Sequence, residues 1–187
     1  MLPLLLLLGF SIPGPKTNYQ PLQDQRWTSC NQSSFSIQHH QNTYQVNYTF
    51  CTSTGKITSS YVDSKIASFS RDVLEYIDSL GWQPRTCKNS NLLEIYEVTT
   101  PVLNDSRRFG TWQSYSPGVN EIWALYDARG YNSGVSSIVL TKQYGWDDIN
   151  FAHELSHYWQ DRLCLTGDFY YNERFANGFE TYLYSGQ

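Results

Sequence analysis

A chain of 187 residues has the size of one ordinary domain and is long enough to bury a hydrophobic core of its own. Its 40% hydrophobic and 16% charged residues exclude a disordered chain and a fibre. The net charge of −4, without a basic stripe, argues against nucleic acid and against stable association with an anionic membrane.

The chain begins with the apolar run MLPLLLLLGFS, which is too short to span a bilayer as a helix. We interpret residues 1–11 as a signal peptide, although the run lacks the usual basic residues at its start. The alternative is that these residues are not a targeting segment. Residues 12–34 are rich in proline and polar side chains and predict a loose N-terminal segment. Residues 35–187 are then expected to form a single domain.

Two further features favour an extracellular protein. There are four cysteines and no CxxC pair, which fits two disulfides better than a metal cluster. All pairings stay open, with a weak preference for Cys30–Cys51 across a hairpin and Cys87–Cys164 across the core. Triplets that accept N-glycans begin at Asn31, Asn47 and Asn104. Together with the leader, these features predict secretion.

The first predicted elements are a pair of strands and a helix. Residues 35–52 alternate apolar and polar side chains, as two half-buried strands do. Residues 63–82 carry apolar side chains at helical spacing, with Asp63 as a plausible N-cap and Gly81 as a C-terminal stop.

Strands and then two helices are expected in the second half. Strand-like runs occupy residues 91–99, 120–128 and 134–142, and RGYNSG joins the last two as a hairpin loop. A helix capped by Asp147 is predicted to run to about Leu163, and a last helix covers 169–185 after Thr166 or Asp168 as cap. This order predicts one α+β domain with a small, twisted, mostly antiparallel sheet.

The stretch NFAHELSHYWQD, in the first of these two helices, contains candidate metal ligands and a candidate general base. His153 and His157 are four residues apart, so both imidazoles lie on one helix face and can bind one zinc ion. Glu154 stands beside them as a general base for a water that the ion activates. An HExxH motif also occurs by chance, but the apolar residues around this one indicate burial, and buried histidines need partners or a metal. By contrast, His39 and His40 are adjacent, so in a strand they face opposite sides and are expected to be ordinary surface residues.

A third protein ligand has to come from outside the motif. The metzincin pattern is excluded, because Gln160 and Leu163 stand where it needs Gly and His, and no methionine follows Met1. The next helix offers Glu173 in NERFANGFE and Glu180 seven residues later.

Here the chain resembles the gluzincin metallopeptidases, in which the HExxH helix is followed by a helix that bears NE and a supporting polar residue four positions on. Asn172 and Glu173 match the NE, Asn177 matches the supporting residue, and ERFANGF looks like the ExxANxF element of minigluzincins. The resemblance covers about residues 136–184. It implies a minimal zincin-like domain with an edge strand, and it makes Glu173 the preferred third ligand over Glu180.

These features predict a secreted peptidase that uses one Zn²⁺ to hydrolyse a peptide or protein substrate. Residues 135–141, just before the HExxH helix, are a candidate edge strand for an extended substrate, although a plain core strand fits them equally well. The alternative function is a disulfide-braced binding or structural protein with a degenerate zincin core, in which a fourth protein ligand such as Glu180 closes the site. A coincidental motif would leave Glu173 far from both histidines. Substrate preference, the oxyanion-stabilising residue and the oligomeric state have no signal in the sequence.

Overall fold

The computed structural model describes residues 28–83, 92–98, 124–127, 136–141, 146–165, 167 and 169–185. The predicted leader 1–11, Cys87 and Asn104 lie outside these residues, as do the predicted caps Thr166 and Asp168 and the predicted loop RGYNSG.

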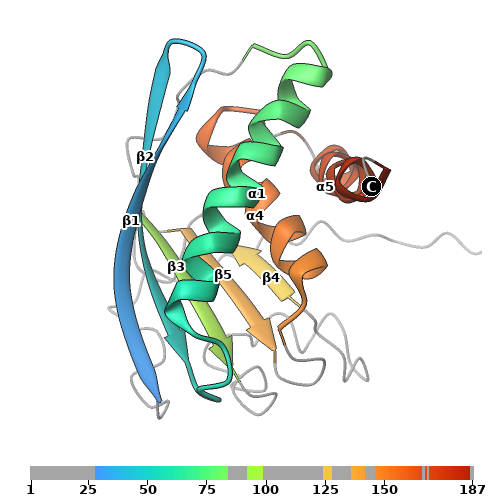
Figure 1. The fold of residues 1–187 in the computed structure, drawn as a ribbon. Coiled ribbons are helices and arrows are strands. Elements are labelled where there is room, and N and C mark those ends of the chain that lie inside the picture. The colour runs from blue at the N-terminus through green and yellow to red at the C-terminus, as the bar shows by residue number, and fades with distance from the viewer. Residues whose placement is uncertain are drawn as a thin grey trace, which may run out of the picture.

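The described residues form five strands and three helices, as expected for an α+β protein (Figure 1). In chain order, the elements are β1 (Ser29–His39), β2 (Asn42–Thr52), α1 (Ser59–Ser79), β3 (Leu92–Val98), β4 (Ala124–Asp127), β5 (Ser136–Thr141), α4 (Asp148–Arg162) and α5 (Phe169–Ser185). The first strand begins at Ser29, inside the segment 12–34 that was predicted to be loose. It does so because the strand pairs with β2 along its full length.

The sheet is mixed, so the prediction of a mostly antiparallel sheet is met only in part. Its strand order is β1-β2-β3-β5-β4. The pairs β1–β2 and β4–β5 are antiparallel, whereas β2–β3 and β3–β5 are parallel. The parallel pairing of β2 with β3 follows from α1, because the helix between them returns the chain to the start of the sheet.

The edge position next to the HExxH helix is also different from the prediction. Residues 135–141 were the candidate edge strand, but β5 lies inside the sheet between β3 and β4. Among the described strands, β4 is the outermost one on that side. The strand β4, which comes before β5 in the chain, therefore covers the edge of the strand that directly precedes α4.

The helices form a layer on one face of the sheet (Figure 1). The face of α1 that packs on the core carries Val62, Ile66, Val73 and Leu74, none of which is exposed. Trp159 and Phe179 add the packing surfaces of α4 and α5, and both are fully buried. Along the described helices, no stretch is both long and apolar enough to cross a membrane.

The helix ends explain where each element begins. The side chain of Thr58 accepts a hydrogen bond from the Tyr61 backbone N–H and caps α1, so the helix starts before the predicted cap Asp63. Asp63 instead accepts a hydrogen bond from the Tyr48 hydroxyl. The predicted cap of α4 is confirmed, because Asp147 Oδ1 accepts from the Ile149 N–H at 2.8 Å. Gly81 has a φ of +71°, a left-handed conformation that ends a helix at low cost.

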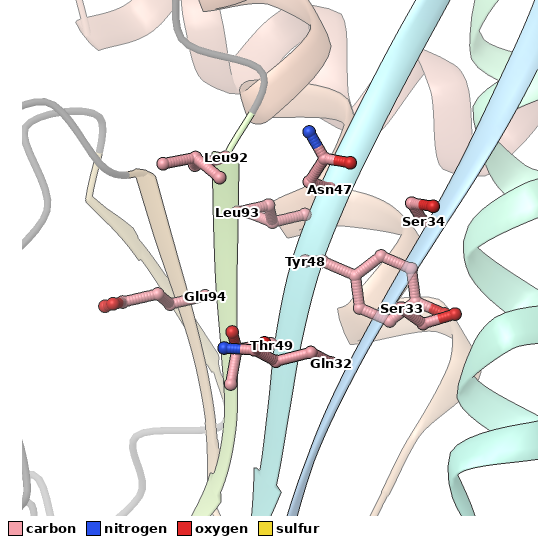
Figure 2. A pocket seen from close by; sticks show the side chains of 9 residues that line it. All are labelled: Gln32, Ser33, Ser34, Asn47, Tyr48, Thr49, Leu92, Leu93 and Glu94. Carbon is pink, nitrogen blue, oxygen red and sulfur yellow. The ribbon is translucent and has the colours of Figure 1, made fainter.

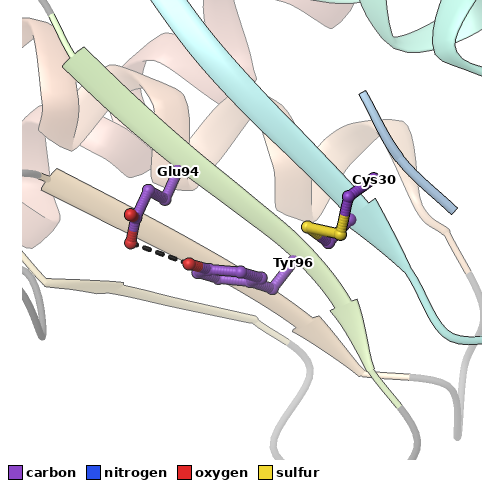
Figure 3. The surroundings of a disulfide bond; sticks show 4 residues. Cys30, Glu94 and Tyr96 are labelled. Carbon is purple, nitrogen blue, oxygen red and sulfur yellow. Dashed lines mark hydrogen bonds between the residues drawn. A yellow bond between two sulfur atoms is a disulfide. The ribbon is translucent and has the colours of Figure 1, made fainter. Parts of the chain in front are cut away.

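The disulfide predicted across the first hairpin is present. Cys30 and Cys51 are directly opposite each other in the β1–β2 register and are bonded (Figure 3). Tyr96 of β3 lies next to this disulfide and donates a hydrogen bond to Glu94 at 2.8 Å. Cys164 is also disulfide-bonded, while its predicted partner Cys87 lies outside the described residues.

The turn of the same hairpin overturns the expectation that the His39 and His40 rings face opposite sides, whereas His40 is exposed as expected. His40 has a φ of +53°, so the strand alternation ends at His39 and the two rings come to the same side. Their centroids are 4.3 Å apart, and both Nε2 atoms approach Asp78 near the end of α1.

A pocket of about 560 Å³ lies over β1, β2 and β3 (Figure 2). Its lining includes Gln32, Thr49 and Glu94, together with the predicted glycan acceptor Asn47. Asn47 is partly buried, whereas the other described acceptor, Asn31, is exposed. The lining contains no residue of the HExxH motif, so the pocket and the predicted chemistry are in different places.

Candidate metal centre

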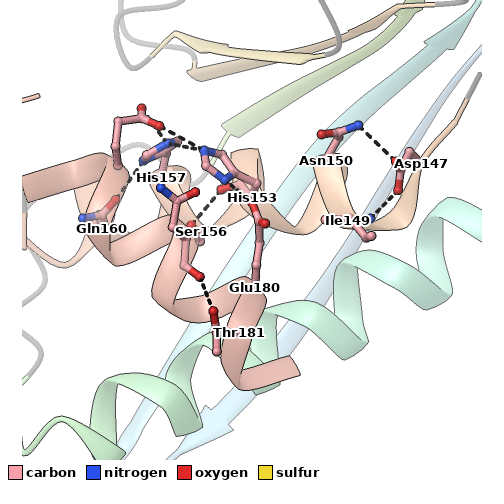
Figure 4. Close-up of polar contacts among 11 residues, drawn as sticks. Asp147, Ile149, Asn150, His153, Ser156, His157, Gln160, Glu180 and Thr181 are labelled. Carbon is pink, nitrogen blue, oxygen red and sulfur yellow. Dashed lines mark hydrogen bonds and ion pairs between the residues drawn. The ribbon is translucent and has the colours of Figure 1, made fainter. Parts of the chain in front are cut away.

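The side chains of α4 and α5 meet at the two motif histidines. His153 and His157 are on the face of α4 that turns toward α5, one helical turn apart (Figure 4). Glu173 reaches the same point from α5. The histidine side chains are only 15% and 10% exposed, while that of Glu173 is 35% exposed, so the group opens toward solvent on the Glu173 side.

Two imidazole nitrogens and the two oxygens of one carboxylate converge at similar distances. The two Nε2 atoms are 3.2 Å apart. Glu173 Oε2 is 3.4 Å from His153 Nε2, and Glu173 Oε1 is 3.4 Å from His157 Nε2. Ligands bound tetrahedrally at 2.0–2.1 Å are separated by about 3.3–3.4 Å. The spacing of this group therefore fits three ligands of one tetrahedral ion.

A second partner orients each imidazole. Glu180 Oε1 is 2.5 Å from His153 Nδ1, and Gln160 Oε1 is 2.8 Å from His157 Nδ1 (Figure 4). Both partner oxygens are acceptors, so each Nδ1 carries the proton and donates it. The unprotonated Nε2 atoms are then the ones that face each other and Glu173.

This arrangement requires a positive charge. Two imidazole lone pairs and one carboxylate face one another at about van der Waals distance or less, and none of these three groups can donate to another while both rings are neutral with their protons on Nδ1. Either a proton or a metal ion has to lie among them. The geometry alone is compatible with both.

If a proton and not a metal ion supplies this positive charge, the pKa values show which group carries it. Burial acts to lower the pKa of His153, but Glu173, Glu154 and Glu180 together raise it to about 9. Burial acts to raise the pKa of Glu173, but the two histidines lower it to about 2. Without a metal, the site therefore holds a protonated His153 beside an ionised Glu173 at neutral pH.

Glu154 lies next to the ligand group and has different surroundings. Burial raises the pKa of its carboxyl, while the nearby His157 and His153 lower it. A hydrogen bond from the Tyr126 backbone connects it to β4. The Tyr126 ring also stacks on His157, with centroids 6.2 Å apart. A carboxylate held in this way is positioned to accept a proton beside the three ligand atoms.

The structure brings together four predicted site residues and separates two. His153, His157 and Glu173 converge, and Glu154 is beside them. Glu180, the competing third ligand, is on the Nδ1 side of His153 and thus behind the ring. Asn177, the predicted supporting residue, is exposed, and its backbone carbonyl accepts a bond from Thr181. The supporting role falls to Glu180.

Gln160 is a site residue that sequence reasoning missed. It was noticed only because it breaks the metzincin pattern, yet it is fully buried and holds His157. Its spacing of three residues from His157 was the available signal, because residues at i and i+3 share a helix face.

Replacing Glu180 by Gln, or Gln160 by Leu, is expected to weaken zinc binding by about 10- to 100-fold without unfolding the protein. Gln160→Leu removes the oxygen that holds the His157 ring with Nε2 facing inward, and Glu180→Gln removes the negative charge that strengthens the hydrogen bond from His153 Nδ1. Competition with a chromophoric chelator measures the affinity. Asn177→Ala is the control and is expected to bind zinc like the wild type; an equal loss in this control would contradict the assigned roles.

Comparisons with protein-family models, curated proteins and solved structures found no match to this chain. Its function is therefore inferred from the chemistry of its own residues.

Proposed function

We propose that the protein is a zinc-dependent peptidase in which His153, His157 and Glu173 hold the ion. The observation that carries this proposal is the convergence of two inward-facing Nε2 atoms and one carboxylate at 3.2–3.4 Å. Imidazole and carboxylate are common zinc ligands, and three protein ligands leave one position for water, as catalytic zinc sites require. The resemblance to gluzincins points to the same three residues.

A bound zinc ion would polarise the peptide carbonyl and lower the pKa of the attacking water. Glu154 takes the proton from that water as its oxygen bonds to the carbonyl carbon. The carboxyl then gives the proton to the peptide nitrogen as the C–N bond breaks, so that one water is consumed per bond cleaved. Burial, which raises the pKa of Glu154, favours this exchange by making the protonated state accessible.

The strand β4 supports a peptide as the substrate. It is the outermost described strand on this side, and Tyr126 in it contacts both Glu154 and His157. An exposed strand edge offers backbone N–H and C=O groups to an extended chain. A peptide added along β4 would pass beside the catalytic carboxylate.

The alternative, a non-catalytic core closed by a fourth protein ligand, receives less support. Glu180 was the expected closing residue, but it bonds to Nδ1 of His153 instead of facing the ligand group. We also infer that the protein is exported, because the Cys30–Cys51 disulfide is stable mainly in oxidising compartments.

The direct test of the proposed activity is removal and return of the metal. Treatment with a zinc chelator is expected to abolish cleavage of an unstructured protein such as casein, and stoichiometric Zn²⁺ is expected to restore it, whereas Mg²⁺ is not. Mass spectrometry of the products detects the cleavage. Cleavage that persists after complete zinc removal would refute the proposal.

A pH dependence of stability follows for the metal-free protein. The folded pKa of His153 is raised from 6.5 to about 9, so its contribution to stability is complete below pH 6.5 and disappears as the pH rises through 9. The melting temperature of the metal-free protein is therefore expected to fall over this window, and less so with zinc bound.

Zinc binding is also expected to release a proton. Since zinc has to displace the His153 proton, calorimetry at pH 7 in buffers of different ionisation enthalpy is expected to detect release of about one proton. Zinc binding without proton release would contradict the assignment of His153.

A further inference from the structure

A second group of ligand-type side chains lies at the opposite end of the hairpin from the disulfide. His39 ends β1, His40 begins the turn to β2, and Asp78 is in the last turn of α1. His39 Nε2 is 3.0 Å and His40 Nε2 is 2.8 Å from the same Asp78 oxygen, Oδ2. All three ligand atoms lie within 4.8 Å of one another. The cluster shares no residue with the His153 site.

Ion pairing with Asp78 alone leaves one of these two nitrogens without a hydrogen bond. His39 Nε2 is buried and has no hydrogen bond of acceptable geometry, although Asp78 Oδ2 is 3.0 Å away. A buried polar nitrogen without a partner is unfavourable, because it has lost the hydrogen bond that it makes with water in the unfolded chain. A cation bound between the two rings and the carboxylate would satisfy this nitrogen, because metal coordination uses its lone pair and needs no donated hydrogen.

The backbone conformation of His40 and the position of Asp78 at the end of α1 also favour a bound cation. His40 has a φ of +53°, an uncommon conformation for a residue other than glycine, and this conformation turns its ring toward His39. Asp78 places a negative charge at the C-terminal end of α1, where the helix dipole disfavours it, and the last turn contains no basic residue. A divalent cation would offset that charge.

We propose that His39, His40 and Asp78 form a second metal site, which binds Zn²⁺ or a similar first-row divalent ion and clamps the β1–β2 turn to the end of α1. Two imidazoles and one carboxylate suit this class of ion better than Mg²⁺ or Ca²⁺. The two distances from Asp78 Oδ2 to the imidazole nitrogens need to lengthen by only a few tenths of an ångström to reach tetrahedral spacing, and His40, which is 62% exposed, is free to adjust. Because its ligands come from both the hairpin turn and the end of α1, such an ion would join these two elements, and we assign it a structural role.

The decisive variant is His40→Gly. Glycine adopts positive φ without strain, so the hairpin is expected to fold at least as well as in the wild type. Titration of the metal-free full chain with micromolar Zn²⁺ is expected to give two bound ions in the wild type and one in His40→Gly. Gln41→Ala, a change in the same turn, is expected to keep both. Asp78→Asn is expected to lose the same ion as His40→Gly, because an amide is a poor substitute for the carboxylate.

Hydrogen exchange gives a readout that tests the clamp itself. Zinc is expected to slow amide exchange in residues 36–45 by about tenfold or more in the wild type, and not in His40→Gly. Equal zinc stoichiometry in the wild type and His40→Gly would overturn the proposal, and so would a His40-dependent ion that leaves exchange in the turn unchanged. Glu173→Ala is expected to lose only the ion at His153 and His157, and His40→Gly only the ion at His39 and Asp78. The number of ions bound by each variant therefore shows which of the two proposed sites fails.

Discussion

Glu154→Gln is expected to reduce peptide hydrolysis by about 10²–10⁴-fold while both the fold and zinc binding at His153 and His157 are retained. Glutamine keeps the size of the side chain but cannot take a proton from water. Because Glu154 is not among the three converging ligand atoms, the ion has no reason to leave. Initial rates on a protein substrate, measured together with bound zinc, separate the two effects.

Two results would contradict this role of Glu154. Equal hydrolysis by the wild type and Glu154→Gln would mean that another group accepts the proton. Loss of zinc together with activity would mean that Glu154 is a ligand. Adding excess zinc to Glu154→Gln distinguishes the two roles of Glu154. If Glu154 is the general base, the variant is expected to stay inactive with zinc bound.

Glu173→Ala is expected to lower zinc affinity by more than about 100-fold, beyond the range for the residues that only orient a ligand. Hydrolysis is expected to fall with the metal content, because two histidines alone do not hold the ion. The side chain of Glu173 is 35% exposed, so its truncation leaves no large cavity, and the helix content is expected to stay unchanged by circular dichroism. Chelator competition measures the affinity.

The matched comparison for Glu173 is Glu180→Gln on the same helix. If Glu173 is the ligand, the loss in Glu173→Ala exceeds that in Glu180→Gln. The reverse order would make Glu180 the third ligand and would require His153 to bind through Nδ1, the nitrogen that Glu180 contacts in the structure.

The helices that carry the site were predictable because their signals are local. Apolar spacing placed the last helix at 169–185, which is the observed span of α5, and Asp147 caps α4 as expected. The start of α1 was wrong because Thr58 and Asp63 are both good capping residues. Pairing of Asp63 with Tyr48 of β2, a contact that depends on the tertiary fold, removes it from the cap position.

The sheet was harder to predict because strand order depends on non-local pairing. Nothing in the strand residues indicates that β5 lies between β3 and β4. The parallel direction of β2 and β3, however, was available in principle, because a helix between two strands favours a crossover. The expectation for His39 and His40 was wrong for a related reason, since it assumed that strand alternation continues into the turn.

The candidate site shows where side-chain geometry is needed. The spacing of His153 and His157 was sufficient to place both rings on one face. Glu173 and Glu180 are two turns apart on one side of α5, so spacing alone could not separate a ligand from its support. Contacts with different nitrogens of His153 distinguish them: Glu173 approaches Nε2 and Glu180 approaches Nδ1.

The most direct test of the central claim is an anomalous difference map at the zinc absorption edge from crystals of the zinc-loaded protein. A peak is expected about 2.0–2.1 Å from Nε2 of His153, Nε2 of His157 and an oxygen of Glu173, with water in the remaining position. Absence of a peak among these three residues, or a fourth protein side chain bound to the ion, would contradict a catalytic zinc site.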